Sequence, residues 1–138
     1  EYAPTLSPDG HWVAYVSNES DPPQVYVRPF PATASARWQV SRAGGSEPVW
    51  SHSGRELFYR DAAGNLVAAT LAPGPSFRVV SERALFSARG YATDILDHAY
   101  VVSADDRSFL FIRIPPSAGP PLVVVLNWFE ELEAKVGR

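Results

Sequence analysis

The chain contains neither cysteine nor methionine among its 138 residues. Without cysteine, neither a disulfide framework nor a thiolate metal site can form, and thiols give no information on the redox compartment. Because even an initiator methionine is missing, we expect a piece of a longer polypeptide or a processed product. No apolar stretch approaches the ~18 residues that a transmembrane helix needs, and no signal-peptide pattern opens the chain, so we expect no segment to insert into a bilayer.

The chain also lacks a cluster of basic residues. Twelve Lys and Arg stand against fifteen Asp and Glu, which gives a formal net charge of −3. Because nucleic-acid-binding domains carry a basic patch or stripe, we expect no nucleic-acid partner. With 46% hydrophobic and 20% charged residues, the composition is that of a globular domain able to bury a core.

An internal repeat is the most informative feature that is present. One short phrase, typified by Leu-Ser-Pro-Asp-Gly followed by an apolar run, occurs three times, over residues 6–15, 50–59 and 102–111. Its serines stand at positions 7, 51 and 103, so they are 44 and then 52 residues apart. Repeats of this period indicate solenoids, arrays or propeller blades.

The repeated phrase predicts a tight hairpin turn. Ser7-Pro8-Asp9-Gly10 places proline where a type I turn needs a fixed φ, and glycine last, where a left-handed residue begins the return strand. Gly54 fills the last position in the second copy, and Asp106 fills it in the third. Aspartate is among the few other residues that adopt positive φ at modest cost, so we expect all three turns to form.

Hydrophobic, β-branched or aromatic runs bounded by turn residues predict strands in units of four. In the first unit the expected strands end at about Leu6 and then span 12–17, 24–29 and 36–41. The second unit is expected to have strands over 47–51, 55–60 and 66–71 and an outer strand within 77–86. The third is expected to have strands over 98–103, 107–114 and 122–126.

The third unit departs from the pattern after its third strand. Asn127 suits a helix N-cap, and Glu130 completes a capping box. We therefore expect a short terminal helix over about 128–136 in place of a fourth strand.

These elements predict an all-β fold, a partial β-propeller of about three four-stranded antiparallel blades with three strands in the last blade and a short C-terminal helix. We expect one domain over 1–138, with blade units at about 1–45, 46–90 and 91–127. Closed propellers have four to eight blades. The chain is therefore expected to be the C-terminal part of a larger propeller, or alternatively to complete a ring by self-association.

A family resemblance supports this prediction. The phrase Ser7-Pro8-Asp9-Gly10-x-x-Val13-Ala14-Tyr15, with Pro4 before it and Val25-Tyr26-Val27 and Gly44-Gly45 after it, resembles the WD-like propeller repeat of the TolB family. The segment over 123–132 is similar to the end of propellers attached to bacterial receptor-type serine/threonine protein kinases. The resemblance implies an extracytoplasmic, periplasmic module for protein interaction or sensing. The alternative is the propeller accessory domain of a prolyl-oligopeptidase-like hydrolase.

We expect this segment to be non-catalytic. It has no Gly-rich phosphate loop, no His-Arg-Asp or Asp-Phe-Gly motif and no G-x-S-x-G elbow. The repeated serines are interpreted as turn residues that form local hydrogen bonds, rather than as nucleophiles. Asp94, Asp97 and His98 form the one metal-like cluster, but their spacing favours a solvated polar loop, so we expect no metal and no cofactor.

Aromatic residues recur at equivalent repeat positions, as Tyr15, Tyr59 and Phe111 do, which indicates packing between sheets rather than ligand stacking. Leu57 and Phe58 are expected to point to opposite faces of a sheet that is buried on both sides by neighbouring blades, and so are their equivalents, Val13 with Ala14 and Phe109 with Leu110.

A candidate interaction face follows from the loops expected at one end of the sheets. It suits a protein or peptide partner, and the alternative is a merely solvated surface. Its residues are Glu19, Asp21, Arg42, Glu47, Asp61, Arg89, Asp94 and Asp97.

Overall fold

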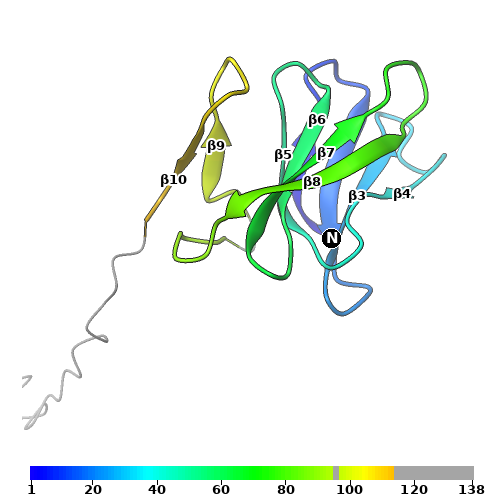
Figure 1. Ribbon diagram of the computed structural model, residues 1–138. Helices are drawn as coiled ribbons and strands as arrows, with labels where there is room; N and C mark the ends of the chain where they lie inside the picture. Colours follow the sequence, from blue (N-terminus) through cyan, green and yellow to red (C-terminus); the bar gives the residue numbers. More distant parts are fainter. Residues whose placement is uncertain (95–96, 114–138) are drawn as a thin grey trace, which may run out of the picture.

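The computed structural model describes residues 1–94 and 97–113, and this part of the chain is all-β (Figure 1). The first sheet consists of β1 (Tyr2–Leu6), β2 (Trp12–Ser17), β3 (Gln24–Pro29) and β4 (Trp38–Gln39). The second consists of β5 (Ser46–Trp50), β6 (Glu56–Arg60), β7 (Asn65–Leu71) and β8 (Val79–Ser87), and the third of β9 (Tyr100–Val102) and β10 (Phe109–Phe111). The strand expected over 122–126 and the helix expected over 128–136 lie outside the described residues.

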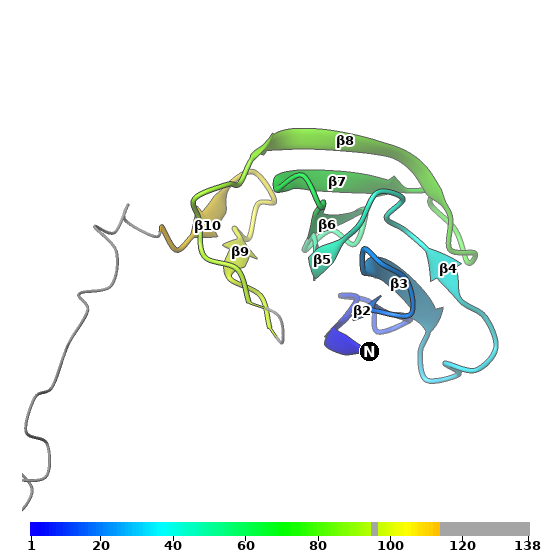
Figure 2. The same ribbon diagram turned by 90° about the horizontal axis from the view of Figure 1, so that it is seen from below.

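Each four-stranded sheet is an antiparallel meander in which strands pair in chain order. Figures 1 and 2 show the second sheet between the other two. Most strands match their predicted ranges within one or two residues. The strand expected over 107–114 is too long, because β10 spans only Phe109–Phe111. The strand expected over 36–41 is also wrong in length, because β4 has only two residues. Its ladder ends early since the amide of Val25 donates to the Ser41 hydroxyl, 2.8 Å away.

The three hairpin turns have the predicted backbone. Gly10, Gly54 and Asp106 have φ values of 74°, 68° and 59°. In each turn the serine hydroxyl accepts the amide five residues later, as Ser7 does from Trp12 at 3.0 Å, and the serines are confirmed as turn residues. The same sequence chemistry therefore gives the same local structure three times.

The core runs through both faces of the second sheet. Leu57 and Tyr59 pack in one cluster with Ala14 and Val16 of the first sheet. Phe58, the residue between Leu57 and Tyr59, packs in a second cluster with the third sheet. The prediction that Leu57 and Phe58 point to opposite, buried faces is confirmed. For the third unit the expected burial of Leu110 is wrong, since Leu110 is 72% exposed. Because successive side chains of a strand point to opposite faces, the single apolar run of β6 contacts both the first and the third sheet.

Candidate functional site

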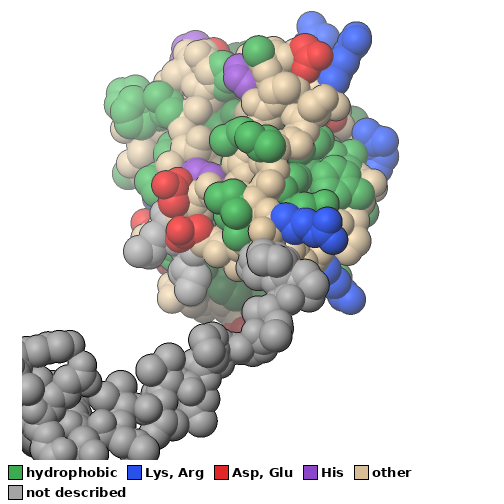
Figure 3. All heavy atoms as spheres, turned by 90° about the vertical axis from the view of Figure 1, so that its left-hand side faces the viewer, with side chains coloured by type: hydrophobic (Ala, Val, Ile, Leu, Met, Phe, Trp, Pro, Cys, Tyr) green, Lys and Arg blue, Asp and Glu red, His purple; other side chains and the backbone are tan. Residues whose placement is uncertain are grey.

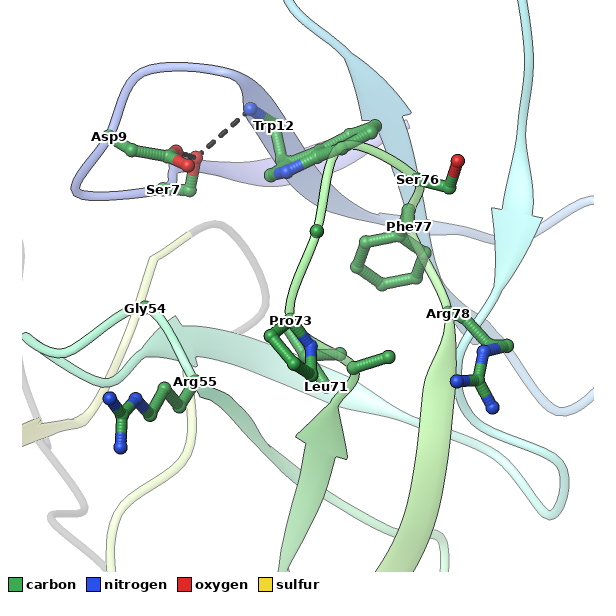
Figure 4. Close-up of a pocket in the computed structure, with 12 residues that line it drawn as sticks. Ser7, Asp9, Trp12, Gly54, Arg55, Leu71, Pro73, Ser76, Phe77 and Arg78 are labelled. Carbon is green, nitrogen blue, oxygen red and sulfur yellow. Dashed lines mark hydrogen bonds between the residues drawn. The ribbon is translucent and has the colours of Figure 1, made fainter.

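An open cleft lies where the turn between β1 and β2, the turn between β5 and β6, and the loop between β7 and β8 meet (Figure 4). Its volume is about 460 Å³. One wall carries Ser7 and Asp9, and the opposite wall carries Gly54 and Arg55. The cleft is therefore built from the repeated turns themselves.

Three aromatic rings form a compact group at this cleft. The Trp12 ring lies 5.6 Å from that of Trp38 and 5.5 Å from that of Phe77, and the Trp38 and Phe77 rings are 5.6 Å apart. Phe77 is buried, whereas Trp12 is only partly buried. The rings pack in edge-on and tilted arrangements, which gives the cleft a rigid apolar side.

The indole N–H of Trp12 has no acceptor among the residues that the structure describes. By contrast, the indole N–H of the buried Trp50 donates to the carbonyl of Thr5 at 3.1 Å. Tryptophan N–H groups usually have a hydrogen-bond partner when buried. Trp12 therefore offers an unused donor at an open cleft lined by apolar rings.

Two arginines at the cleft lack a carboxylate partner within the described ranges 1–94 and 97–113. Among the described residues, neither Arg55 nor Arg78 has a carboxylate within 4.0 Å, and both are exposed. Asp9 is already engaged, since its Oδ1 accepts from the Ser7 hydroxyl at 2.6 Å and from the His11 amide at 3.1 Å. These hydrogen bonds lower the pKa of Asp9 and keep it ionised.

The second and third turns, unlike the first and second, are linked by a side chain, that of Asp106. Asp106 accepts the amides of His52 and Ser53 at 2.6 and 2.9 Å, so the third turn is tied to the second. Gly54 occupies the equivalent position in the second turn and has no side chain to reach the first. A methyl group added there would come only within 3.9 Å of Pro8. The cleft therefore stays open where this bridge is missing.

One residue of the candidate interaction face does not belong on the surface. Glu47 is 1% exposed, and its Oε2 lies 2.7 Å from Nε of the buried Arg60. Its Oε1 accepts the amide of Asp94 at 2.6 Å, and its carbonyl accepts the hydroxyl of Tyr100 at 2.9 Å. Glu47 is thus corrected to an interior residue that ties β5 to the segment before the third sheet.

The other predicted residues of this face are distributed over several local contacts. Asp61 accepts the amide of Asn65 at 2.8 Å, and Arg89 donates to the carbonyl of Ala63 at 2.7 Å, so these two stabilise one hairpin. Glu19 pairs with Arg37 at 2.7 Å, and Arg42 pairs with Glu82 at 3.4 Å.

Asp21 precedes a cis-proline, Pro22. The amide of Asp97 donates to the carboxylate of Asp94 at 3.2 Å, and the Asp97 carboxylate lies 3.1 Å from the ring of His98. The described residues contain no group of three or more His, Asp or Glu side chains able to hold a metal ion. In the same part of the chain, no helix is long and apolar enough to cross a membrane.

No protein-family model matches the chain, and no curated protein matches it significantly. The open cleft between the turns at Ser7 and Gly54 and the β7–β8 loop is called the turn-end cleft below. It was not among the predicted sites, because the sequence analysis interpreted the aromatic residues as core. A sequence signal for it exists, since Ser53 replaces the aspartate of the first turn and leaves Arg55 without the carboxylate that His11 has.

Proposed function

We propose that the chain is the C-terminal portion of a TolB-like β-propeller and acts as a non-catalytic module for protein interaction or sensing. Each described sheet is then a blade or part of one. The proposal extends to an extracytoplasmic role next to a bacterial receptor-type kinase, which rests on the similarity of residues 123–132 to the ends of such propellers.

The observation that carries the proposal is the repeated packing of one unit. Leu57 and Tyr59 face the first sheet, and their equivalents Phe109 and Phe111 face the second. Sheets that pack face to face in chain order are what a propeller requires. Such a scaffold leaves turns and loops gathered at the two ends of the sheets, where binding surfaces usually form.

The repeated serines support the non-catalytic part of the proposal. The hydroxyls of Ser7 and Ser103 lie 2.6 Å from the carboxylates of Asp9 and Asp105 and also accept a backbone amide. The Ser51 hydroxyl lies 3.1 Å from that of Ser53 and accepts the amide of Glu56. Each hydroxyl is therefore used within its own turn.

A selection from a random peptide library tests the proposal. The folded full chain is immobilised, bound peptides are selected, and each selected peptide is titrated into isotope-labelled chain while backbone amide shifts are recorded. We expect peptides with dissociation constants of about 1 to 100 μM whose shifts gather at the loops of one end of the sheets. Scrambled peptides are the control. Selected peptides that bind no better than their scrambled versions contradict the proposal.

A further inference from the structure

We propose that the turn-end cleft binds an extended acidic peptide, with Trp12 donating a hydrogen bond to a peptide carbonyl and Arg55 pairing with a peptide carboxylate. This inference rests on the proposed function and deepens it, because it names the end of the sheets that binds and the chemistry of the partner.

The size and lining of the cleft suit a short extended segment. Its volume of about 460 Å³ lies within the range of ligand sites, and it is open on one side rather than enclosed. In Figure 4 Trp12 lies across the cleft from Arg55 and Pro73, with Ser7 and Asp9 beside it, and the Arg55 guanidinium extends from the rim of the cleft away from Trp12. An apolar side and a few convergent polar groups are the usual composition of a binding site.

The ring arrangement favours a peptide over a sugar. A pyranose ring stacks on an open aromatic face, but Trp12 packs against both Trp38 and Phe77 at 5.5–5.6 Å between centroids. What the cleft offers instead is an aromatic edge and an indole N–H that has no acceptor within the part of the chain that the structure describes. Grooves lined with aromatic side chains bind peptides in the polyproline II conformation, whose carbonyls are free to accept hydrogen bonds.

The sign of the partner's charge follows from a comparison of the first and second turns. His11 in the first turn lies 3.2 Å from the carboxylate of Asp9. Arg55 stands at the equivalent position of the second turn, where serine replaces that aspartate. The second turn therefore has a cation, Arg55, but no carboxylate at the position that Asp9 holds in the first turn. An acidic side chain of a partner supplies the missing charge and adds a charge-assisted hydrogen bond.

The binding test uses the full chain labelled with ¹⁵N and two capped six-residue probes, Pro-Pro-Leu-Pro-Glu-Glu and its Gln-Gln counterpart. The indole N–H signals are recorded during each titration, and the Trp12 signal is assigned from the Trp12→Phe variant. We expect the acidic probe to shift the Trp12 signal and to bind about threefold to tenfold more tightly than the neutral probe, with an advantage that shrinks as salt is added. A Trp12 signal that stays unmoved at about 5 mM acidic probe overturns the proposal.

Two arginine variants separate the cleft from general electrostatics. Arg55→Gln is expected to weaken binding of the acidic probe about threefold to fivefold, since a partly exposed ion pair is lost. Arg107→Gln is the matched control, because Arg107 holds the equivalent position in the third turn, and its effect is expected to stay within about 1.5-fold. Equal losses in the two variants contradict a specific role for Arg55.

The hydrogen bond has its own variant. Trp12→Phe keeps an aromatic ring and removes the indole N–H, and we expect about threefold to tenfold weaker binding with an unchanged circular dichroism spectrum. Cellohexaose serves as a carbohydrate probe, and a Trp12 shift with this sugar alone overturns the peptide assignment. Library peptides that bind only at the loops of Asp61 and Arg89 leave the proposed function standing and overturn this inference.

Discussion

Asp106 shows how one side chain can link a turn to its neighbour. It adopts a φ of 59° at the position that Gly10 and Gly54 fill in the other two turns. This backbone costs more for aspartate than for glycine. In return its carboxylate, which is 18% exposed, accepts the amides of His52 and Ser53 and joins the second and third turns.

The bridge made by Asp106 predicts a pH-dependent stability. Desolvation raises its pKa, but the hydrogen bonds from His52 and Ser53 outweigh this, so the pKa lies below the usual 3.8. A lowered pKa in the folded state means that the stabilisation is present above the unfolded-state pKa and is lost as the pH falls through the folded-state value. We expect Asp106→Asn to lower the free energy of unfolding by about 1 kcal/mol near pH 7, and by progressively less as the pH falls below 3.8 and through the lower folded-state pKa, measured by urea denaturation.

Asp106→Gly is the control for the backbone contribution. Glycine removes the cost of positive φ together with the bridge, so we expect it to be less destabilising than Asp106→Asn. A difference between wild type and Asp106→Asn that stays constant from acid to neutral pH contradicts the role of the ionised carboxylate.

Sequence alone predicted the turns but not the buried ion pair. Positive φ was predictable because Gly10, Gly54 and Asp106 occupy one position of a local motif. Burial of Glu47 was not, since its partner Arg60 stands on the next strand. A comparison of the repeats could have indicated the buried ion pair. Glu47 and Arg60 stand where the first sheet has the apolar residues Ala3 and Val16, so two apolar positions carry opposite charges in the second unit.

At the scale of elements, the second sheet depends on what covers its two faces. Phe58 is 2% exposed, and its ring lies 4.9 Å from that of Phe109 in the third sheet. Phe86 also packs on Phe109, with 5.9 Å between centroids, but is 40% exposed at the edge. The two phenylalanines share a neighbour and differ in burial, so they form a matched pair.

Truncating Phe58 and Phe86 to alanine measures how strongly the contact between the second and third sheets stabilises the fold. We expect Phe58→Ala to lower the free energy of unfolding by about 3 kcal/mol or more, because it removes buried apolar surface and leaves a cavity. Phe86→Ala is expected to cost about 1 kcal/mol, since much of its ring already meets water. Chemical denaturation of both variants measures the difference, and similar losses contradict the burial argument.

Strand boundaries were predictable where a turn residue stops each strand, as in β2 and β3. The length of β4 was not, because its end is decided by a contact with a distant residue. Ser41 takes the amide of Val25 through its hydroxyl, and that hydroxyl also donates to the side chain of Gln24 at 2.6 Å. A serine hydroxyl that takes the place of a backbone carbonyl acceptor does not alter the alternation of apolar and polar residues, so the sequence pattern could not indicate it.

At the scale of the whole described structure, the outward faces of the first and third sheets differ. The third sheet exposes Val101 and Leu110 by 56% and 72%, and Ile112, directly after β10, is 66% exposed. Figure 3 shows hydrophobic side chains on this side of the molecule. On the first sheet, Tyr15 and Tyr26 are buried beneath two arginines, with Arg37 4.4 Å from the Tyr26 ring and Arg28 5.6 Å from that of Tyr15. The first sheet also exposes Leu6, by 48%, so among the described residues the third sheet has the larger exposed apolar surface of the two.

The exposed apolar face at the third sheet corresponds to the face of the first sheet that packs on the second sheet. Leu110 and Ile112 hold the positions of Ala14 and Val16, which face the second sheet in the first core cluster. Because Arg28 and Arg37 cover Tyr15 and Tyr26 of the first sheet, the larger exposed apolar surface of the described residues is that of the third sheet. We expect this surface to meet the same surface of another copy. Such self-complementary contact gives a closed two-fold dimer, whereas contact between the two different faces would give a ring or an open chain.

We therefore expect the full chain to form dimers through the third sheet at raised concentration. Replacing Leu110 and Ile112 together by serine removes the exposed apolar area and should weaken the dimer at least about tenfold, as measured by sedimentation velocity. Val80→Ser is the control, because Val80 is 56% exposed on β8, away from this face, and should leave association unchanged. A chain that stays monomeric, or that forms larger assemblies unaffected by the double change, contradicts a two-fold contact at this face.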